Sequence, residues 1–72
     1  MTNVIRNYTI ERTDLRVRSV KLEGTEREFT IERNRLLGFC EALLGLGMMD
    51  DKDVASTMEY FDHQTLGYVK ER

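Results

Sequence analysis

The stretch MMDDKDVASTMEYFDH, residues 48–63, constrains the fold more than any other part of the chain. With Asp50 as N-cap, Asp53 stands in the first helical turn, where carboxylates favour the positive end of a helix dipole. Apolar side chains then recur at helical spacing, namely Val54, Ala55, Met58 and Phe61. The sequence therefore predicts a helix over about residues 51–66, with Gly67 as a plausible stop.

A second helix is expected directly before it, over about residues 32–46. Its stripe consists of Leu36, Cys40, Leu43 and Leu44, and is widened by Leu37, Phe39, Ala42 and Leu46. Glu41 is the single charge between residues 36 and 49. A helix that is apolar nearly all round is buried on more than one side. Gly47 suits the left-handed residue that closes such a helix, so the two helices form a tight αα-hairpin.

The outline of this hairpin resembles a DNA-binding helix-turn-helix, but its charges oppose DNA binding. A recognition helix brings its N-terminal residues close to phosphates and base edges. Here that end carries Asp50, Asp51 and Asp53 against the single cation Lys52. Because phosphate attraction supplies most of the non-specific affinity, we do not expect nucleic acid to bind this helical pair.

The first half of the chain alternates polar and apolar residues, which favours strands. Residues 4–11 alternate well enough for one strand, and Gly24-Thr25 suits the two-residue turn of a hairpin over 15–31. That register places Val20, Leu22, Phe29 and Ile31 on one face. The other face then holds Ser19, Lys21, Glu28 and Thr30. One apolar and one polar face is what a half-buried antiparallel sheet needs.

The segment 25–28 also matches a helix capping box, with Thr25 followed three residues later by Glu28. We set this alternative aside because the apolar residues that follow do not keep a helical period. The expected fold is therefore α+β: a small three-stranded antiparallel sheet with its central hairpin at 15–31, followed by helices at 32–46 and 51–66. Residues 67–72 form a frayed tail or a short edge strand, and residues 1–72 form one domain.

Charge and cysteine content indicate the setting in which the chain works. Residues 1–35 carry eight Lys or Arg and six Asp or Glu, whereas residues 36–72 carry three and seven. The one cysteine, Cys40, cannot form an intrachain disulfide, which is typical of a reducing compartment. The least charged run, residues 36–49, is shorter than the ~20 residues that cross a bilayer. We expect a cytoplasmic protein without a membrane segment.

No arrangement of side chains predicts catalysis, so we expect neither an enzyme nor a cofactor. The single histidine, His63, follows Glu59 by four residues and makes an ordinary helix-surface pair. Cys40 stands in the most apolar helix and reads as a small core residue. The DDKD run lacks the glycine and glutamate of a calcium loop, so no metal site is expected.

What remains is binding to another protein, as an inhibitor, adaptor or assembly factor. The candidate contact residues are two methionines at the helix junction and the acidic face that follows them: Met48, Met49, Asp50, Asp51, Asp53, Glu59 and Asp62. Methionine suits adaptable contacts, and an acidic face suits a basic partner. A homodimer through helix 32–46 is a further arrangement that we consider. Small acidic regulatory proteins of this type are common among phage and mobile-element accessory proteins.

An alternative function is nucleic-acid binding by the predicted sheet. Four arginines lie close together in sequence, with Tyr8 among them: Arg6, Arg12, Arg16 and Arg18. Basic residues interleaved with a stacking aromatic residue can bind a single strand. Six acidic residues are interleaved in the same half of the chain, so we rank this alternative second.

Overall fold

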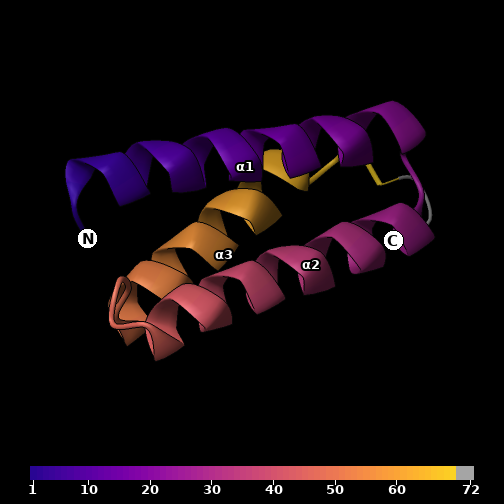
Figure 1. Ribbon diagram of the computed structural model, residues 1–72. Helices are drawn as coiled ribbons and strands as arrows, with labels where there is room; N and C mark the ends of the chain where they lie inside the picture. The colour runs from indigo at the N-terminus through magenta and orange to yellow at the C-terminus, as the bar shows by residue number, and fades with distance from the viewer. Residues whose placement is uncertain (70–72) are drawn as a thin grey trace.

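The computed structural model describes residues 1–69 and contains three helices (Figure 1). They are α1 (Asn3–Glu23), α2 (Glu26–Gly45) and α3 (Asp51–Thr65). No residue between 1 and 69 is in a strand. The α+β expectation is therefore wrong, because residues of the predicted hairpin 15–31 lie in α1 and at the start of α2 instead.

Local capping signals explain why the first half of the chain is helical. The Thr2 hydroxyl accepts a hydrogen bond from the Ile5 N–H at 3.2 Å and caps the start of α1. At the other end Gly24 has φ 67°, and its N–H donates to the Val20 carbonyl at 2.7 Å. Both the predicted hairpin turn and the observed helix end require a positive φ here, so Gly24 does not discriminate between them.

The start of α2 is decided by the capping pattern that we set aside. The Thr25 hydroxyl accepts a hydrogen bond from the Glu28 N–H at 3.1 Å, and the helix begins at Glu26. Acidic residues in this first turn also favour the positive end of the helix dipole. The helix predicted over 32–46 therefore exists, but it starts six residues earlier than expected.

The junction between α2 and α3 has the predicted form. Gly47 has φ 75°, and the Met48 N–H donates to the Leu43 carbonyl at 2.8 Å. These are the marks of a Schellman helix end. Asp50 and Asp53 exchange side-chain-to-backbone hydrogen bonds at 2.8 and 3.1 Å, which forms the predicted cap of α3.

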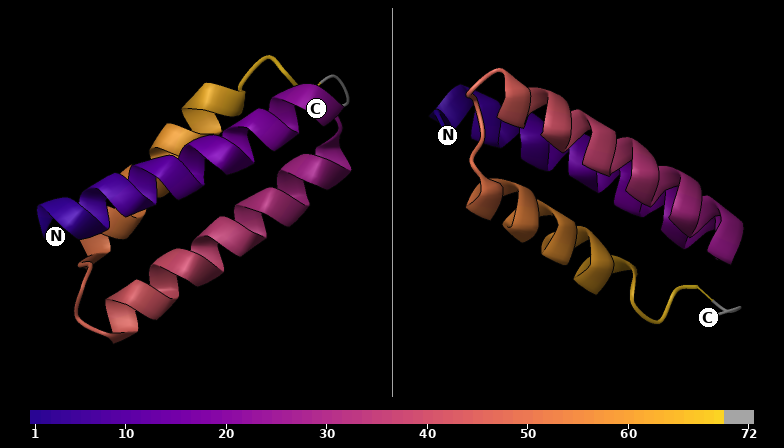
Figure 2. Two further views of the ribbon diagram at one scale, coloured as in Figure 1. Left: turned by 45° about the horizontal axis from the view of Figure 1, so that its top comes forward. Right: turned by 90° about the horizontal axis from the view of Figure 1, so that it is seen from below.

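Each helix packs against the other two around one core (Figures 1 and 2). Both views show α1 running beside α2 after the short turn that joins them. The rings of Phe29 from α2 and Phe61 from α3 stack with their centroids 5.7 Å apart. The buried core consists of Val17, Val20, Phe29, Leu36, Cys40, Met49, Met58, Phe61 and Val69.

The side of α1 that faces this core is unusually polar. Thr9 and Thr13 are buried there along with Val17 and Val20. The Thr9 hydroxyl donates to the Ile5 carbonyl at 2.7 Å, whereas the Thr13 hydroxyl has no hydrogen-bond partner among residues 1–69. Half of the buried face of α1 is thus threonine, so a search for apolar side chains at helical spacing misses this helix.

A buried carboxylate on α2 adds to the polar interior. Glu32 is only 6% exposed and accepts from Arg16 of α1 at 3.4 Å and from Arg35 at 3.0 Å. A buried charge without a partner would be strongly destabilising, so these two arginines offset the cost of burying Glu32.

The chain after α3 returns to the turn between α1 and α2. Val69 is buried in the core, and the Lys21 ammonium lies 4.6 Å from the centroid of the Tyr68 ring. Within the described part of the predicted tail, residues 67–69 therefore pack on the bundle and form no strand. Residues 70–72 of that tail lie outside the described residues.

Candidate protein-interaction surface

The outer face of α1 carries large apolar side chains that are half-exposed or more. Val4 is 76% exposed, Leu22 81%, Tyr8 48% and Leu15 44%. They recur at spacings of four and seven residues, and Glu11 and Arg18 occupy the intervening positions of the same face. At about 100° per residue, all of these positions fall within a sector of about 80°. We call this surface the α1 stripe: Val4, Tyr8, Glu11, Leu15, Arg18 and Leu22.

One end of the α1 stripe is held in place by neighbouring side chains. The Tyr8 ring lies 5.8 Å from the Phe39 ring of α2, and the Arg12 guanidinium lies 5.7 Å from the Tyr8 centroid. Aromatic and cation–π contacts of this kind fix the orientation of a ring. The Tyr8 ring is therefore held by two neighbours while it remains half-exposed.

The two methionines predicted as contact residues differ in exposure. Met48 is 43% exposed, whereas Met49 is 5% exposed and belongs to the core. Leu46, just before them, is 70% exposed. The junction between α2 and α3 thus offers two separate apolar side chains, Leu46 and Met48, and no continuous row.

Most of the predicted acidic face has structural partners within the chain. Asp50 and Asp53 form the cap of α3, and Asp62 receives two hydrogen bonds from the Arg33 guanidinium, at 2.9 and 3.1 Å. Asp51 and Glu59 are exposed and form no ion pair with any of residues 1–69. These two carboxylates are what remains of the acidic face for an outside partner.

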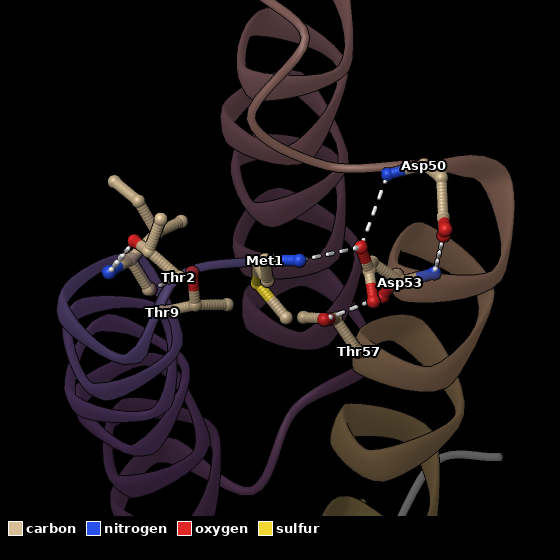
Figure 3. A network of polar contacts seen from close by, with 7 residues as sticks. Met1, Thr2, Thr9, Asp50, Asp53 and Thr57 are labelled. Carbon is tan, nitrogen blue, oxygen red and sulfur yellow. Dashed lines mark hydrogen bonds and ion pairs between the residues drawn. The ribbon is translucent and has the colours of Figure 1, made fainter.

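The cap of α3 also meets the chain's first residue (Figure 3). The Met1 ammonium lies 3.9 Å from an Asp53 carboxylate oxygen, between the first turns of α1 and α3. The backbone hydrogen bond that Asp50 shares with Asp53 lowers the pKa of the Asp50 carboxyl. Asp50 and Asp53 are therefore engaged in hydrogen bonds and an ion pair within the chain.

The structure does not gather the four arginines of α1 on one face. The alternative function required them together: Arg6, Arg12, Arg16 and Arg18. Arg16 is directed to Glu32, and Arg12 lies over the Tyr8 ring. Arg18 shares the outer stripe, while Arg6 lines a hollow on the α3 side. The sheet that was to carry them is not present in residues 1–69.

That hollow, of about 390 Å³, lies between α1 and α3. Its walls include the half-exposed side chains of Ile10 and Tyr60, and its floor includes Thr9 and the unpartnered hydroxyl of Thr13. The Tyr60 hydroxyl donates to the Asp14 carboxylate at 2.7 Å, which raises the pKa of Tyr60. This bond ties the two helices together across the hollow.

The two side chains considered for catalysis have different surroundings. Cys40 is fully buried in α2, and burial raises the pKa of its thiol. A reactive cysteine needs the opposite, a stabilised thiolate that solvent and substrate can reach. His63 lies exposed in the last turn of α3. Residues 1–69 hold no group of three or more His, Cys, Asp or Glu placed to bind a metal ion.

The residues predicted for a dimer through helix 32–46 are divided between the core and the solvent. In α2 the apolar side chains face inward, with Leu36 and Cys40 fully buried. Its outward side is small or polar, with Asn34, Gly38 and Ala42 exposed.

No helix among the described residues is both long and apolar enough to span a membrane.

The α1 stripe was not predicted from the sequence because its residues were expected to lie in strands. Tyr8, Leu15 and Leu22 are separated by seven residues each, a period that belongs to a helix face and not to a strand. That repeat is the signal that would have identified the surface.

Comparison of the chain with protein-family models, with curated proteins and with solved structures finds no match in any of the three.

Proposed function

We propose that this chain is a helical protein-interaction module that binds another protein through the α1 stripe. The observation that carries the proposal is the exposure of Val4 and Leu22, at 76% and 81%, on a helix whose opposite side is half threonine. Contiguous apolar surface on a small protein commonly marks an interaction site. Burying one such side chain fully contributes about 1.5–3 kcal/mol, so three or four of them suffice for a specific contact.

The chemistry of the stripe favours a helix as the binding element of the partner. Its apolar side chains recur at the four- and seven-residue spacing that helix-to-helix packing uses. Glu11 and Arg18 then supply charges that select the orientation of the bound helix. The proposal takes the module to act by binding in the cytoplasm, as an inhibitor, adaptor or assembly factor, and not by catalysis.

The test is a comparison of captured proteins between the wild-type chain and two single variants. Leu15→Lys places a charge in the middle of the α1 stripe, whereas Leu46→Lys places one on an exposed leucine outside it. Tagged protein is incubated with nuclease-treated lysate of the source cells. We expect a partner that is retained by wild type and Leu46→Lys and is lost with Leu15→Lys.

Circular dichroism of both variants checks that the bundle remains folded. Equal retention by all three proteins would reject the α1 stripe as the binding surface. Recovery of nucleic acid alone, and only when nuclease is omitted, would support the alternative function instead.

A further inference from the structure

We propose that the partner of the α1 stripe is a second copy of this chain, with the two α1 helices packed antiparallel about a two-fold axis at Leu15. This inference rests on the proposed function only in placing the contact on the α1 stripe. It adds the identity of the occupant and the direction in which its helix runs.

Three of the four apolar positions of the stripe, Tyr8, Leu15 and Leu22, are symmetric about Leu15. Tyr8 precedes Leu15 by seven residues and Leu22 follows it by seven. At 1.5 Å per residue, each lies about 10 Å from Leu15 along the helix axis. A two-fold axis through Leu15 therefore brings Leu15 against its own copy and Tyr8 against Leu22 of the second copy, twice. Such a self-complementary patch is what an isologous dimer requires.

The charges of the stripe obey the same symmetry with opposite signs. Glu11 precedes Leu15 by four residues and Arg18 follows it by three. In the antiparallel arrangement, each Glu11 faces Arg18 of the second copy. A parallel arrangement would place Glu11 against Glu11 and Arg18 against Arg18, and like charges in an interface cost affinity. The pattern therefore complements itself in one direction only.

Both charged side chains are available for this contact. Glu11 and Arg18 are exposed, and neither forms an ion pair with another of residues 1–69. This distinguishes Arg18 from Arg16, which is engaged with Glu32 inside the bundle. The α1 stripe thus contains one free acid and one free base, at nearly equal distances on either side of its centre.

The size of the surface sets the expected strength of the dimer. One helix of 21 residues supplies the whole contact on each side. Stable dimers usually bury about 800 Å² per partner, and a single-helix contact lies at or below that area. We therefore expect a reversible dimer with a dissociation constant in the micromolar range.

Sedimentation equilibrium over a concentration series, from low micromolar to near-millimolar, tests the surface. Wild type and Leu46→Lys are expected to dimerise alike, and Leu15→Lys to be monomeric throughout the series. Leu15 and Leu46 are both exposed, so neither substitution disturbs the core. A monomeric wild type at the highest concentration, or a dimer of unchanged affinity in Leu15→Lys, would overturn the inference.

Charge exchange tests the direction of the helices. We expect E11R alone and R18E alone each to weaken the dimer roughly tenfold, because two attractive pairs become repulsive. The double variant E11R/R18E restores it, and an equimolar mixture of E11R with R18E forms a heterodimer tighter than either homodimer. In a parallel dimer like charges already face each other, so neither single exchange would weaken it and the double exchange would restore nothing. That result would overturn the antiparallel assignment.

The proposed function and the dimer fail in different ways. If the wild type is monomeric but captures a different protein that Leu15→Lys does not, the α1 stripe remains a binding surface and its second-copy occupant is rejected. If the wild type and Leu15→Lys dimerise equally, the dimer uses another surface and the second-copy inference is rejected. The α1 stripe as a binding surface is rejected only by equal retention of a captured protein by wild type and Leu15→Lys.

Discussion

The helices α1 and α3 distribute their side chains in opposite ways. In α3 the apolar residues Met58 and Phe61 are buried, while exposed positions such as Asp51 and Glu59 are polar. In α1, threonines occupy half of the buried positions, and the large apolar side chains of Val4 and Leu22 face the solvent. Folding of the isolated bundle accounts for the pattern of α3 and leaves that of α1 without an explanation.

The difference indicates that the side-chain pattern of α1 is not explained by folding of the bundle alone. A helix that only had to pack in this bundle would gain from apolar residues at the positions of Thr9 and Thr13 and from polar ones at Val4 and Leu22. The chain has the reverse. A second contact on the outside of α1 is the simplest physical reason for an apolar surface that contributes little to the core.

The largest effect is expected when a buried apolar residue of α3 is replaced, in comparison with an exposed apolar residue of α1. Phe61→Ala should lower the free energy of unfolding by about 3–5 kcal/mol, because Phe61 is fully buried and its ring stacks on Phe29. Leu22→Ala, at an 81% exposed position, should change that free energy by less than about 0.5 kcal/mol. Urea unfolding at a protein concentration where the chain is monomeric measures both changes.

A large loss of stability in Leu22→Ala would show that the α1 stripe packs within the monomer, and the contrast between α1 and α3 would be wrong. Urea unfolding at high protein concentration tests the contrast further. There the dimer adds to the stability of wild type by mass action, and Leu22→Ala should lose that addition while Phe61→Ala should keep it.

The same contrast explains which parts of the fold could be predicted. The α3 sequence combines a capping box, an apolar stripe and a glycine near its end, so pattern and capping signals agree, and its predicted bounds are within one residue. For α1 the pattern was misleading, because β-branched threonine and valine occupy its buried side and Tyr8 and Leu15 its exposed side. The apolar residues of the α1 stripe lie on the side of the helix opposite the core, so the apolar period of the sequence does not mark the buried face of this helix.

Three of the predicted contact residues have structural partners within the chain that sequence spacing revealed only in part. Asp50, Asp53 and Asp62 were assigned to a partner, but they bind backbone groups and Arg33 within the chain. Sequence spacing identified the cap itself yet gave no information on the cross-helix pair, which joins residues 29 positions apart. The seven-residue repeat of the α1 stripe was readable, but only once that segment is known to be a helix.

The start of α2 offers the next test, because it separates the capping signal from the strand pattern. Thr25→Ala should lower the free energy of unfolding by about 1 kcal/mol, since the Glu28 N–H loses its acceptor. Thr25→Asp should retain most of the wild-type stability because aspartate is an equally good N-cap. Equal losses in both variants would mean that Thr25 acts through something other than the cap of α2.

A smaller effect of opposite sign is expected inside α1. Thr13→Val should raise the free energy of unfolding by up to about 1 kcal/mol, because it removes a buried hydroxyl that has no hydrogen-bond partner. The matched variant is Thr65→Val in α3, where the hydroxyl donates to the carbonyls of Phe61 and Asp62 at 2.9 and 3.2 Å. That variant should be neutral or destabilised. If Thr13→Val is the less stable of the two, the hydroxyl of Thr13 has a partner in solution.

The smallest effect concerns the caps of the two helices and depends on pH. The cap of α1 is the neutral hydroxyl of Thr2, whereas α3 is capped by the Asp50 carboxylate, whose pKa is lowered by its backbone hydrogen bond with Asp53. A carboxyl with a lowered folded-state pKa contributes stability above its unfolded pKa of about 3.9, and that contribution disappears as the pH falls through the folded value. Thermal unfolding of wild type and Asp50→Asn should therefore show a small advantage for wild type at neutral pH that vanishes in acid. Asparagine keeps the capping geometry without the charge, so an advantage that persists in acid would show that ionisation of Asp50 does not stabilise the start of α3.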